Sequence, residues 1–171
     1  MIKPIVILSE YKSEWEYRFN QERKKIIEVI GDKIEGIEHI GSTSIKGLKA
    51  KPITDILVGI EDLSTVSSIV PPLNSIEYEY VPKPEVTDRI FFRKGLWGKG
   101  TCHLHVCEIH STEWVEKLLF RDYLRKYPKV AEEYAFLKSE LATKYKYDRP
   151  TYTCQKEPFI KEIIEKAKRE L

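Results

Sequence analysis

The stretch from Glu38 to Ile60 constrains the fold of this 171-residue chain more than any other part of the sequence. Its first residues complete a run of alternating apolar and polar residues over 34–40, which predicts a half-buried strand. It passes through a turn of small residues, Gly41–Ser44, and continues into an apolar run over 53–60. An apolar run of that length is typical of a central strand that is covered on both faces. The stretch therefore predicts two strands of one sheet, with helices needed to cover it.

The rest of the chain supplies those helices and the remaining strands. Apolar residues at helical spacing, with capping residues at the ends, predict helices over about 13–30, 63–73, 112–126, 128–145 and 151–170. Short apolar or alternating runs predict strands over 76–81, 89–93 and 101–108, and either an edge strand or an extended lead-in over 5–8. The glycine-rich connection 95–100 predicts that the last two strands form an antiparallel hairpin. We therefore expect one domain over 1–171 of α/β (α+β) class, with a mixed sheet flanked by helices and a helical C-terminal third.

Composition excludes several broad functional classes. The chain has 29 basic and 27 acidic residues, a balance that does not predict nucleic-acid binding by net field. Its apolar runs are far shorter than the roughly 18–20 residues of a membrane span, and we see no signal peptide. The three cysteines lack a CxxC spacing, which favours free thiols that pack in the interior and a reducing, cytoplasmic location.

The turn Gly41-Ser42-Thr43-Ser44 has the composition of an anion-binding loop. Glycine tolerates a positive φ, so the backbone can turn sharply and present successive N–H groups, and the three hydroxyls add donors. This suits a phosphate group, although the chain has no P-loop motif. The cations Lys51, Arg93 and Lys156 are candidates for further phosphate contacts. The alternative is a tight turn with a hydroxyl cap, and cations that point into water.

Asp55 is a lone carboxylate in an apolar strand, where it requires a partner. Lys51 is one candidate for that partner. His103 and His105 are a second, because alternation places both imidazoles on one face of their strand. Together with Asp55 they would form a three-ligand site for a divalent cation such as Mg²⁺, with Asp55 and His105 as the catalytic pair. The alternative is a pair of hydrogen-bonding histidines on a solvated face.

Several segments resemble the GrpB family of small bacterial proteins. The matching segments span the whole chain and are 38–44, 47–48, 50–53, 55–56, 89–95, 103–106 and 120–124, followed by Tyr134, 137–138, 141–142, 148–149, Tyr152, Lys156 and 159–160. Lys46 departs from the family, many members of which have proline there. The family is similar to the nucleotidyltransferase superfamily, and this implies the same mixed sheet flanked by helices.

The resemblance also implies roles for individual residues. Gly41 and Ser42 match the phosphate-binding glycine-serine pair of the superfamily, and Asp55 matches its first metal-binding acid. The second acid, two positions further along the strand, is replaced by Leu57. The resemblance places His105 on the strand where a third acid often sits.

The sequence leaves three functions open. The first is a protein that binds a nucleotide or another phosphorylated small molecule and transfers a nucleotidyl group with a divalent metal. The second is a binding module that kept the phosphate loop and lost catalysis, because Leu57 removes half of the metal clamp. The third is a structural or interaction protein.

Overall fold

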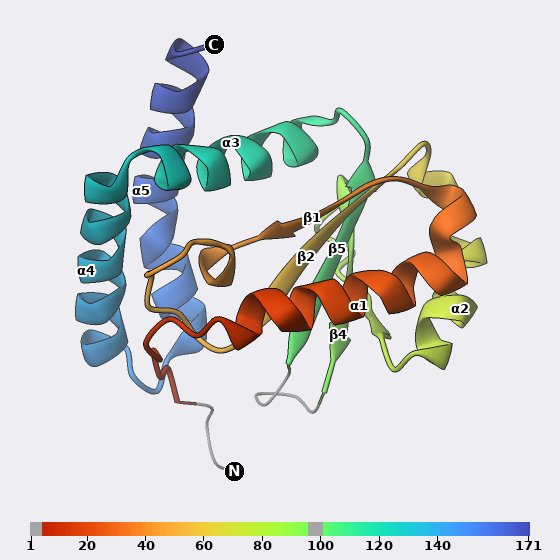
Figure 1. Ribbon diagram of the computed structural model, residues 1–171, viewed down its shortest axis with the longest axis horizontal. Coiled ribbons are helices and arrows are strands. Elements are labelled where there is room, and N and C mark those ends of the chain that lie inside the picture. The colour runs from red at the N-terminus through yellow and green to blue at the C-terminus, as the bar shows by residue number, and fades with distance from the viewer. Residues whose placement is uncertain (1–4, 96–100) are drawn as a thin grey trace.

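A five-stranded mixed sheet forms the centre of the protein. The computed structural model describes residues 5–95 and 101–171 (Figure 1). The strands follow the spatial order β1-β2-β5-β4-β3, in which β2 and β5 are parallel and the other pairs are antiparallel. Their bounds are β1 (Ile34–Ile40), β2 (Thr54–Ile60), β3 (Glu79–Val81), β4 (Arg89–Lys94) and β5 (Cys102–Glu108). The predicted mixed sheet is confirmed, with the apolar β2 at its interior and β1 at one edge.

Helices cover the two faces of the sheet unequally. α1 (Glu14–Ile30) and α2 (Val70–Ser75) pack on one face, where Ile26 and Ile30 join the central core with Ile56 of β2. On the other face α3 (Thr112–Lys126) places Trp114 against the strands. Gly36 and Gly59 make room for that indole, because a Cβ at Gly36 would lie 2.7 Å from the Trp114 ring. The opposite end of this second face, towards the start of β2 and β5, holds the candidate site.

The C-terminal helices α4 (Pro128–Lys144) and α5 (Arg149–Arg169) stand at one end of the sheet, beyond the loop that joins β1 to β2 (Figure 1). A second apolar cluster fixes them there. Ile45 and Leu48 of the loop pack against Leu124, Ala131, Tyr134 and Ile163 of the helical layer. The loop is thus held between the sheet and the helices, and its first residues are the Gly41–Ser44 turn.

Four local predictions differ from the structure. Residues 5–8 form no strand, and the nearest pairing is an isolated bridge between Ser9 and Ala50. The helix predicted over 63–73 is split into a 3-10 segment (Leu63–Ser68) and α2, which carries Pro71 and Pro72 in its first turn. The strand predicted from residue 76 begins only at Glu79, because Glu77 has a positive φ of 75°. Cys154 is exposed, whereas Cys102 and Cys107 are buried as expected.

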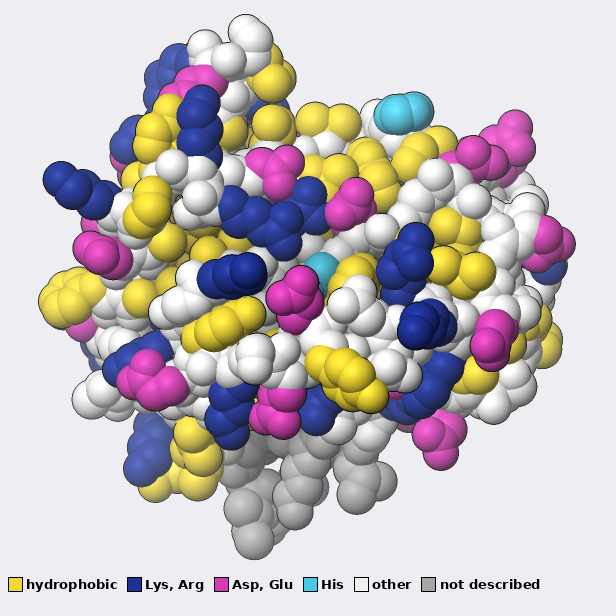
Figure 2. Space-filling model, viewed as in Figure 1, with side chains coloured by type: hydrophobic (Ala, Val, Ile, Leu, Met, Phe, Trp, Pro, Cys, Tyr) yellow, Lys and Arg dark blue, Asp and Glu magenta, His cyan; other side chains and the backbone are white. Residues whose placement is uncertain are grey.

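The antiparallel pairing of β4 with β5 is confirmed, although residues 96–100 of their connection lie outside the described part of the chain. Across the described residues no helix is both long enough and apolar enough to cross a membrane. Lys and Arg side chains are interspersed with Asp and Glu over the side of the molecule seen in Figure 2, as the near-neutral composition suggested.

Candidate functional site

The Gly41–Ser44 turn lies directly against Asp55. Antiparallel pairing of β1 with β2 sets Ile40 opposite Asp55, so the turn that ends β1 must pass over the carboxylate. Gly41 has φ 72° and ψ −177°, a backbone region that essentially only glycine occupies. A Cβ on Gly41 would lie 2.5 Å from Asp55 Oδ2. Glycine is required here for its backbone angles and for the space that the acid fills.

Two imidazoles flank the Asp55 carboxylate on the other side. The parallel register pairs Asp55 with His103 and Leu57 with His105, so all four side chains project from one face of the sheet. His103 Nδ1 lies 3.6 Å and His105 Nε2 lies 3.5 Å from Asp55 Oδ1. The prediction that Asp55, His103 and His105 converge is therefore confirmed. Lys51, the other candidate partner, forms no ion pair with Asp55 within 4.0 Å.

The charge state of this group follows from its surroundings. Burial acts to raise the pKa of Asp55, but hydrogen bonding and charge from His103 and His105 overcome it and hold that pKa well below its usual range. Burial lowers the pKa of His105 although Asp55 acts against this. The Nδ1 atom of His105 is buried and has no hydrogen-bond partner. The site therefore presents a carboxylate held beside imidazoles rather than a bare acid.

The residues present do not fit a two-acid metal clamp. Leu57 is fully buried between β2 and α3, where it packs with Ile40, Cys107 and Trp114. Across residues 5–95 and 101–171 no group of three or more His, Cys, Asp or Glu side chains is arranged to hold a metal ion. Asp55, His103 and His105 lie together as one carboxylate beside two imidazoles, and we derive no step through a metal.

The hydroxyls of the turn have different roles from those expected. Ser44 Oγ donates to the Gly41 carbonyl at 2.5 Å, and Thr43 Oγ1 lies 2.9 Å from His39 Nε2. Both side chains are buried and already have partners within the protein. Ser42 is only half-buried. Of the three hydroxyls, that of Ser42 is the least buried, and it hydrogen-bonds with Tyr134.

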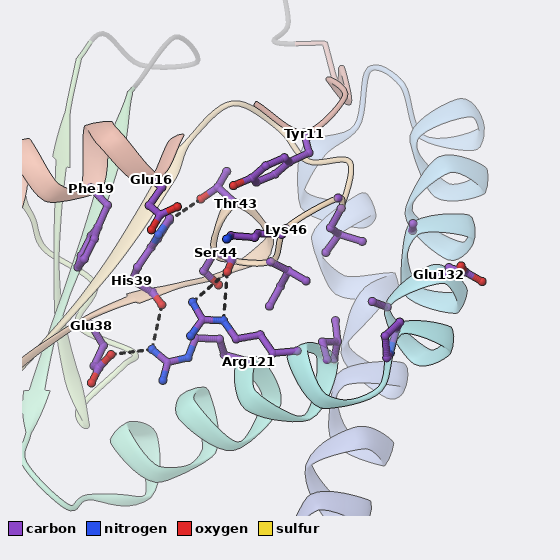
Figure 3. Close-up of a pocket in the computed structure, with 18 of the residues that line it drawn as sticks. Tyr11, Glu16, Phe19, Glu38, His39, Thr43, Ser44, Lys46, Arg121 and Glu132 are labelled. Atoms are coloured by element: carbon purple, nitrogen blue, oxygen red, sulfur yellow. Dashed lines mark hydrogen bonds and ion pairs between the residues drawn. The ribbon is translucent and has the colours of Figure 1, made fainter. Parts of the chain in front are cut away.

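Two arginines of α3 hold the turn from the free edge of β1. Arg121 Nη1 donates to Glu38 Oε2 at 2.7 Å and to the His39 carbonyl at 3.1 Å. Arg125 donates through Nε and Nη2 to the Ser44 carbonyl, at 3.2 Å and 2.9 Å. Figure 3 shows these contacts converging on the turn. Arg121 is buried, with 9% of its surface exposed.

A pocket of 720 Å³ lies on this arginine side of the turn (Figure 3). Its walls come from α1, the end of β1, the turn and the junction of α3 with α4, and they include Tyr11, His39 and Lys46. Phe19 stacks on the His39 ring, with 4.8 Å between centroids, and closes the α1 side. Burial lowers the pKa of His39 to about 4, so this imidazole is neutral near pH 7. Asp55 and its two histidines are not part of this pocket.

Three lysines gather on the other side of the turn, around two tyrosines of the helical layer. Lys51 Nζ and Lys156 Nζ lie 5.3 Å and 4.7 Å from the centre of the Tyr152 ring. Lys138 Nζ lies 4.9 Å from the centre of the Tyr134 ring. We call Lys51, Lys138 and Lys156 the lysine cluster.

The lysine cluster has no compensating acid. Within the described residues, none of its three ammonium groups has a carboxylate within 4.0 Å. Lys138 is 2% exposed, and its ammonium group donates to the backbone carbonyl of Lys49. Two further polar atoms beside the cluster, Tyr152 Oη and Arg149 Nε, are buried and have no hydrogen-bond partner. A fully buried cation of this kind costs stability unless something else supplies its counter-charge.

The charge of Asp55 acts on the pKa values of two members of the lysine cluster, Lys51 and Lys156. Burial, and then the charge of Lys51, lower the pKa of Lys156 to about 8, while Asp55 acts in the opposite direction. Burial, and then the charges of Lys156 and Lys51, lower the pKa of Lys138 to about 7. Burial lowers the pKa of Lys51, and Asp55 opposes this as well. Burial, and then Tyr152, raise the pKa of Tyr134; its hydrogen bond with Ser42 acts against this, and the charge of Asp55 adds to it.

The structure thus brings together most of the residues chosen from the sequence. Gly41, Ser42, Lys51 and Lys156 border the region around Asp55. Arg93 lies opposite His103 in the register of β4 and β5, but its guanidinium is ion-paired with Glu79 at 3.4 Å.

Sequence reasoning gave no role to Lys138 or Tyr134. A signal for both was present. Ala131, Tyr134 and Lys138 follow one another at helical spacing along the buried side of α4. A lysine on an apolar helical stripe is a residue to examine for an unusual role.

Comparison with known proteins establishes the relationship of the chain. The family profile described as "GrpB protein" matches residues 5–166. The chain belongs to the GrpB family. It is 37% identical over 163 residues to the "Glutamate-rich protein GrpB" of Alkalihalophilus pseudofirmus, covering 93% of this chain and 94% of that protein. It is 38% identical over 161 residues to the UPF0157 protein YqkA of Bacillus subtilis, covering 93% of this chain but only 46% of that longer protein.

Solved structures agree with the family and identify the fold. The crystal structure of GrpB from Enterococcus faecalis superposes with a TM-score of 0.88 at 34% identity, covering 96% of this chain and 98% of that one. The Cid1 poly(U) polymerase superposes with a TM-score of 0.54 at 11% identity, over 80% of this chain and 43% of that one. At that identity the match shows the fold alone. This GrpB-family protein has a nucleotidyltransferase-like fold, as the sequence resemblance implied.

Proposed function

We propose that this GrpB-family protein binds a nucleotide or another phosphorylated small molecule beside Asp55, between Gly41-Ser42 and the lysine cluster. One observation carries the proposal. Three lysines, two of them with pKa values lowered to about 7 and about 8, surround Tyr134 and Tyr152 without a carboxylate partner. A cluster of desolvated cations of this kind is more costly than a solvated one, and an anionic ligand supplies the missing counter-charge.

The local backbone supports the same ligand class. The end of β1 turns at Gly41 with a positive φ, and Ser42 follows with a half-buried hydroxyl that hydrogen-bonds with Tyr134. Backbone N–H groups in such turns bind phosphate oxygens. Phosphate contacts from the turn and from the lysines would lie on two sides of one ligand.

Nucleotidyl transfer is a second candidate, which the position of Asp55 favours. Its carboxylate stays ionised because His103 and His105 hold its pKa down. An ionised carboxylate beside a bound phosphate can accept a hydrogen bond from an attacking hydroxyl and orient it, but so low a pKa makes it a weak base. Leu57 leaves this carboxylate without the second acid of the superfamily, so we place ligand binding ahead of transfer.

A thermal-shift panel tests the proposed function. Nucleoside mono-, di- and triphosphates and phosphorylated sugars are each added to the protein, with and without MgCl₂. A ligand at 100 times its Kd adds roughly 2.7 kcal/mol to the free energy of unfolding, which raises the melting temperature. We expect at least one phosphorylated compound to do so, and its unphosphorylated counterpart not to.

Variants assign the effect to the site. Lys156→Met should abolish the shift, whereas Lys161→Met, at an exposed position of the same helix, should leave it intact. Asp55→Asn separates the two candidates, because pure binding survives it and nucleotidyl transfer does not. If no phosphorylated compound at millimolar concentration raises the melting temperature, the proposed function is wrong.

A further inference from the structure

The lysine cluster differs from a metal-dependent phosphate site in how its positive charge is supplied. In the Cid1 polymerase, which shares this fold, structures have been determined with MgGTP and with MgATP bound. Magnesium offsets the charge of a triphosphate and is held by carboxylates of the protein. Here the second acid is Leu57, which is fully buried, and Asp55 already contacts two imidazoles. No group of three or more His, Cys, Asp or Glu in residues 5–95 and 101–171 is arranged for a metal ion.

The same region has an excess of fixed positive charge. Beyond the effect of burial, the charges of Lys156 and Lys51 lower the pKa of Lys138, and that of Lys51 lowers the pKa of Lys156. Arg149 adds a fourth cation, which lowers the pKa of Lys51 after burial has done so. Within the described residues, Asp55 is the carboxylate whose charge opposes the lowered pKa values of Lys51 and Lys156. Three lysines and one arginine against one aspartate leave a surplus of three positive charges when all are ionised. A chain of linked phosphates carries several negative charges, and such a surplus would neutralise most of them.

Buried atoms without partners indicate that the cluster is shaped for contacts it does not make within the protein. Tyr152 is 0% exposed, and its hydroxyl oxygen has no hydrogen-bond partner. The ammonium groups of Lys51 and Lys156 both lie over the ring of this tyrosine. Arg149 Nε, beside them, is also buried without a partner. Buried polar atoms of this kind are rare in native proteins and mark places where a ligand or an ordered water completes the structure.

We infer that the lysine cluster binds a polyphosphate chain without a divalent cation, with Lys51, Lys138 and Lys156 supplying the positive charge that magnesium supplies in the polymerase. The inference rests on the proposed function and narrows it in two ways. It selects ligands with three or more linked phosphates, and it makes magnesium unnecessary for binding. Inorganic tripolyphosphate and the triphosphate of a nucleotide share this chemistry.

Calorimetric titration of the full chain tests the inference directly. Inorganic tripolyphosphate, ATP, ADP and AMP are titrated separately, once in EDTA and once in excess MgCl₂. We expect tripolyphosphate and ATP to bind in EDTA, with affinities at least equal to those in MgCl₂, because magnesium neutralises the ligand that the lysines recognise. ADP should bind more weakly and AMP should not bind measurably.

Each other result has a definite meaning. Binding of ATP only in MgCl₂ would overturn the inference and leave the proposed function standing. Binding of AMP as tightly as ATP would overturn the selection for a phosphate chain. Binding of ATP without any binding of tripolyphosphate would show that the nucleoside, rather than the phosphate chain, is recognised, which also contradicts the inference. No binding of any compound in either buffer would refute both the inference and the proposed function.

Lys138 provides the variant that separates charge from structure. Lys138→Met and Lys138→Gln both remove the ammonium charge, and Gln keeps a donor for the Lys49 carbonyl. We expect tripolyphosphate to bind at least roughly tenfold more weakly to both variants, since a desolvated charged contact is lost. Lys144→Met, at an exposed position of α4, should bind normally. Retained affinity in Lys138→Gln would mean that Lys138 acts only through the loop backbone, and would remove it from the binding site.

The melting temperature of Lys138→Met also controls for loss of the fold. Replacing a buried unpaired cation by an apolar side chain of similar length tends to stabilise a protein. A variant that melts at or above the wild-type temperature and binds tripolyphosphate weakly supports the inference. If Lys138→Met melts well below wild type, Lys156→Met takes its place in the comparison, with Lys161→Met as its control.

Discussion

Arg121 and Lys138 are both buried cations on neighbouring helices, but Arg121 is paired with carboxylates and Lys138 is not. Arg121 has two carboxylates, Glu38 at 2.7 Å and Asp122 at 2.9 Å, and also donates to the His39 carbonyl. Lys138 has one backbone carbonyl, that of Lys49, and no carboxylate within 4.0 Å among the described residues. A paired buried cation helps to hold a fold together, whereas an unpaired one lowers stability and persists where a ligand uses it.

The two cations contact the chain at two places between β1 and β2. Arg121 donates to the His39 carbonyl at the end of β1, and Arg125 donates to the Ser44 carbonyl of the turn. Lys138 contacts the backbone of Lys49, eight residues after Gly41. The arginines therefore set the position of the turn, and the lysine cluster faces the residues that the turn presents. Substitution of an arginine should therefore lower the free energy of unfolding, and substitution within the lysine cluster should weaken ligand binding.

The largest effect should come from Gly41, where the two sides meet. Gly41→Ala forces alanine into a backbone region that only glycine tolerates, and sets its Cβ 2.5 Å from Asp55 Oδ2. We expect a loss of about 3 kcal/mol or more in the free energy of unfolding, measured by urea denaturation. Gly47→Ala is the matched control, since Gly47 has φ 82° but no atom within 4 Å of a Cβ. Its loss should be about 1 kcal/mol. Equal losses would show that the contact with Asp55 has no cost.

The next largest effect should come from Arg121. Arg121→Met leaves the Glu38 carboxylate and the His39 carbonyl without their donor. We expect a loss of about 2 kcal/mol, less than for a fully buried pair because the Glu38 side chain is 41% exposed. Arg23→Met, at an exposed position of α1, should change stability by less than about 0.5 kcal/mol. If Arg121→Met is as harmless as its control, the contrast with Lys138 has no energetic basis.

These two sides of the turn were not equally predictable from the sequence. The individual strands, the Gly41 turn and the shared face of His103 and His105 follow from the period of two in strands and from glycine chemistry, which are local rules. The parallel pairing that brings these histidines to Asp55 is a contact between distant parts of the chain, which the sequence analysis offered only as a hypothesis. The partners of Arg121 and Lys138 depend on how α3 and α4 pack against a loop that is more than 80 residues away in the chain, at separations of 83 and 89 residues. No local pattern specifies such contacts. The periodicity of α4 placed Lys138 on the buried side, but packing alone shows that it has no acid there.

A smaller change, which should raise rather than lower the free energy of unfolding, is expected from Lys138. Lys138→Met removes a buried ammonium whose pKa burial and the neighbouring lysines lower to about 7. The loss of the bond to the Lys49 carbonyl offsets part of the gain. We expect a net stabilisation of about 1–2 kcal/mol at pH 7, measured by urea denaturation without ligand. Lys144→Met should have almost no effect. A destabilised Lys138→Met would mean that its bond to the loop outweighs the cost of its charge.

The smallest effect, and the most specific, is the pH dependence of that gain. The pKa of Lys138 falls from 10.5 to about 7 on folding. Below pH 7 the lysine is protonated in both states, and the full penalty of the buried charge is present. Between pH 7 and 10.5 the folded protein holds fewer protons than the unfolded chain, so its stability rises with pH. Lys138 alone should add about 1 kcal/mol between pH 7 and pH 8.

Lys51 and Lys156 also have lowered pKa values, so they too make stability rise with pH. Both are present in the wild type and in Lys138→Met, so the difference between the two proteins isolates the contribution of Lys138. The raised pKa of Tyr134 affects stability only at much higher pH. Urea denaturation at pH 6.5, 7, 7.5 and 8 should show the advantage of Lys138→Met shrinking by about 1 kcal/mol from pH 7 to pH 8. The same experiment on Arg121→Met should give a constant difference from wild type, since a paired guanidinium keeps its proton throughout this range. If the Lys138→Met and wild-type curves stay parallel, Lys138 keeps its proton in the folded protein as Arg121 does. The two buried cations would then differ in their partners but not in their electrostatic cost, because a lysine that stays charged up to pH 8 must draw compensation from water or from the Tyr134 ring.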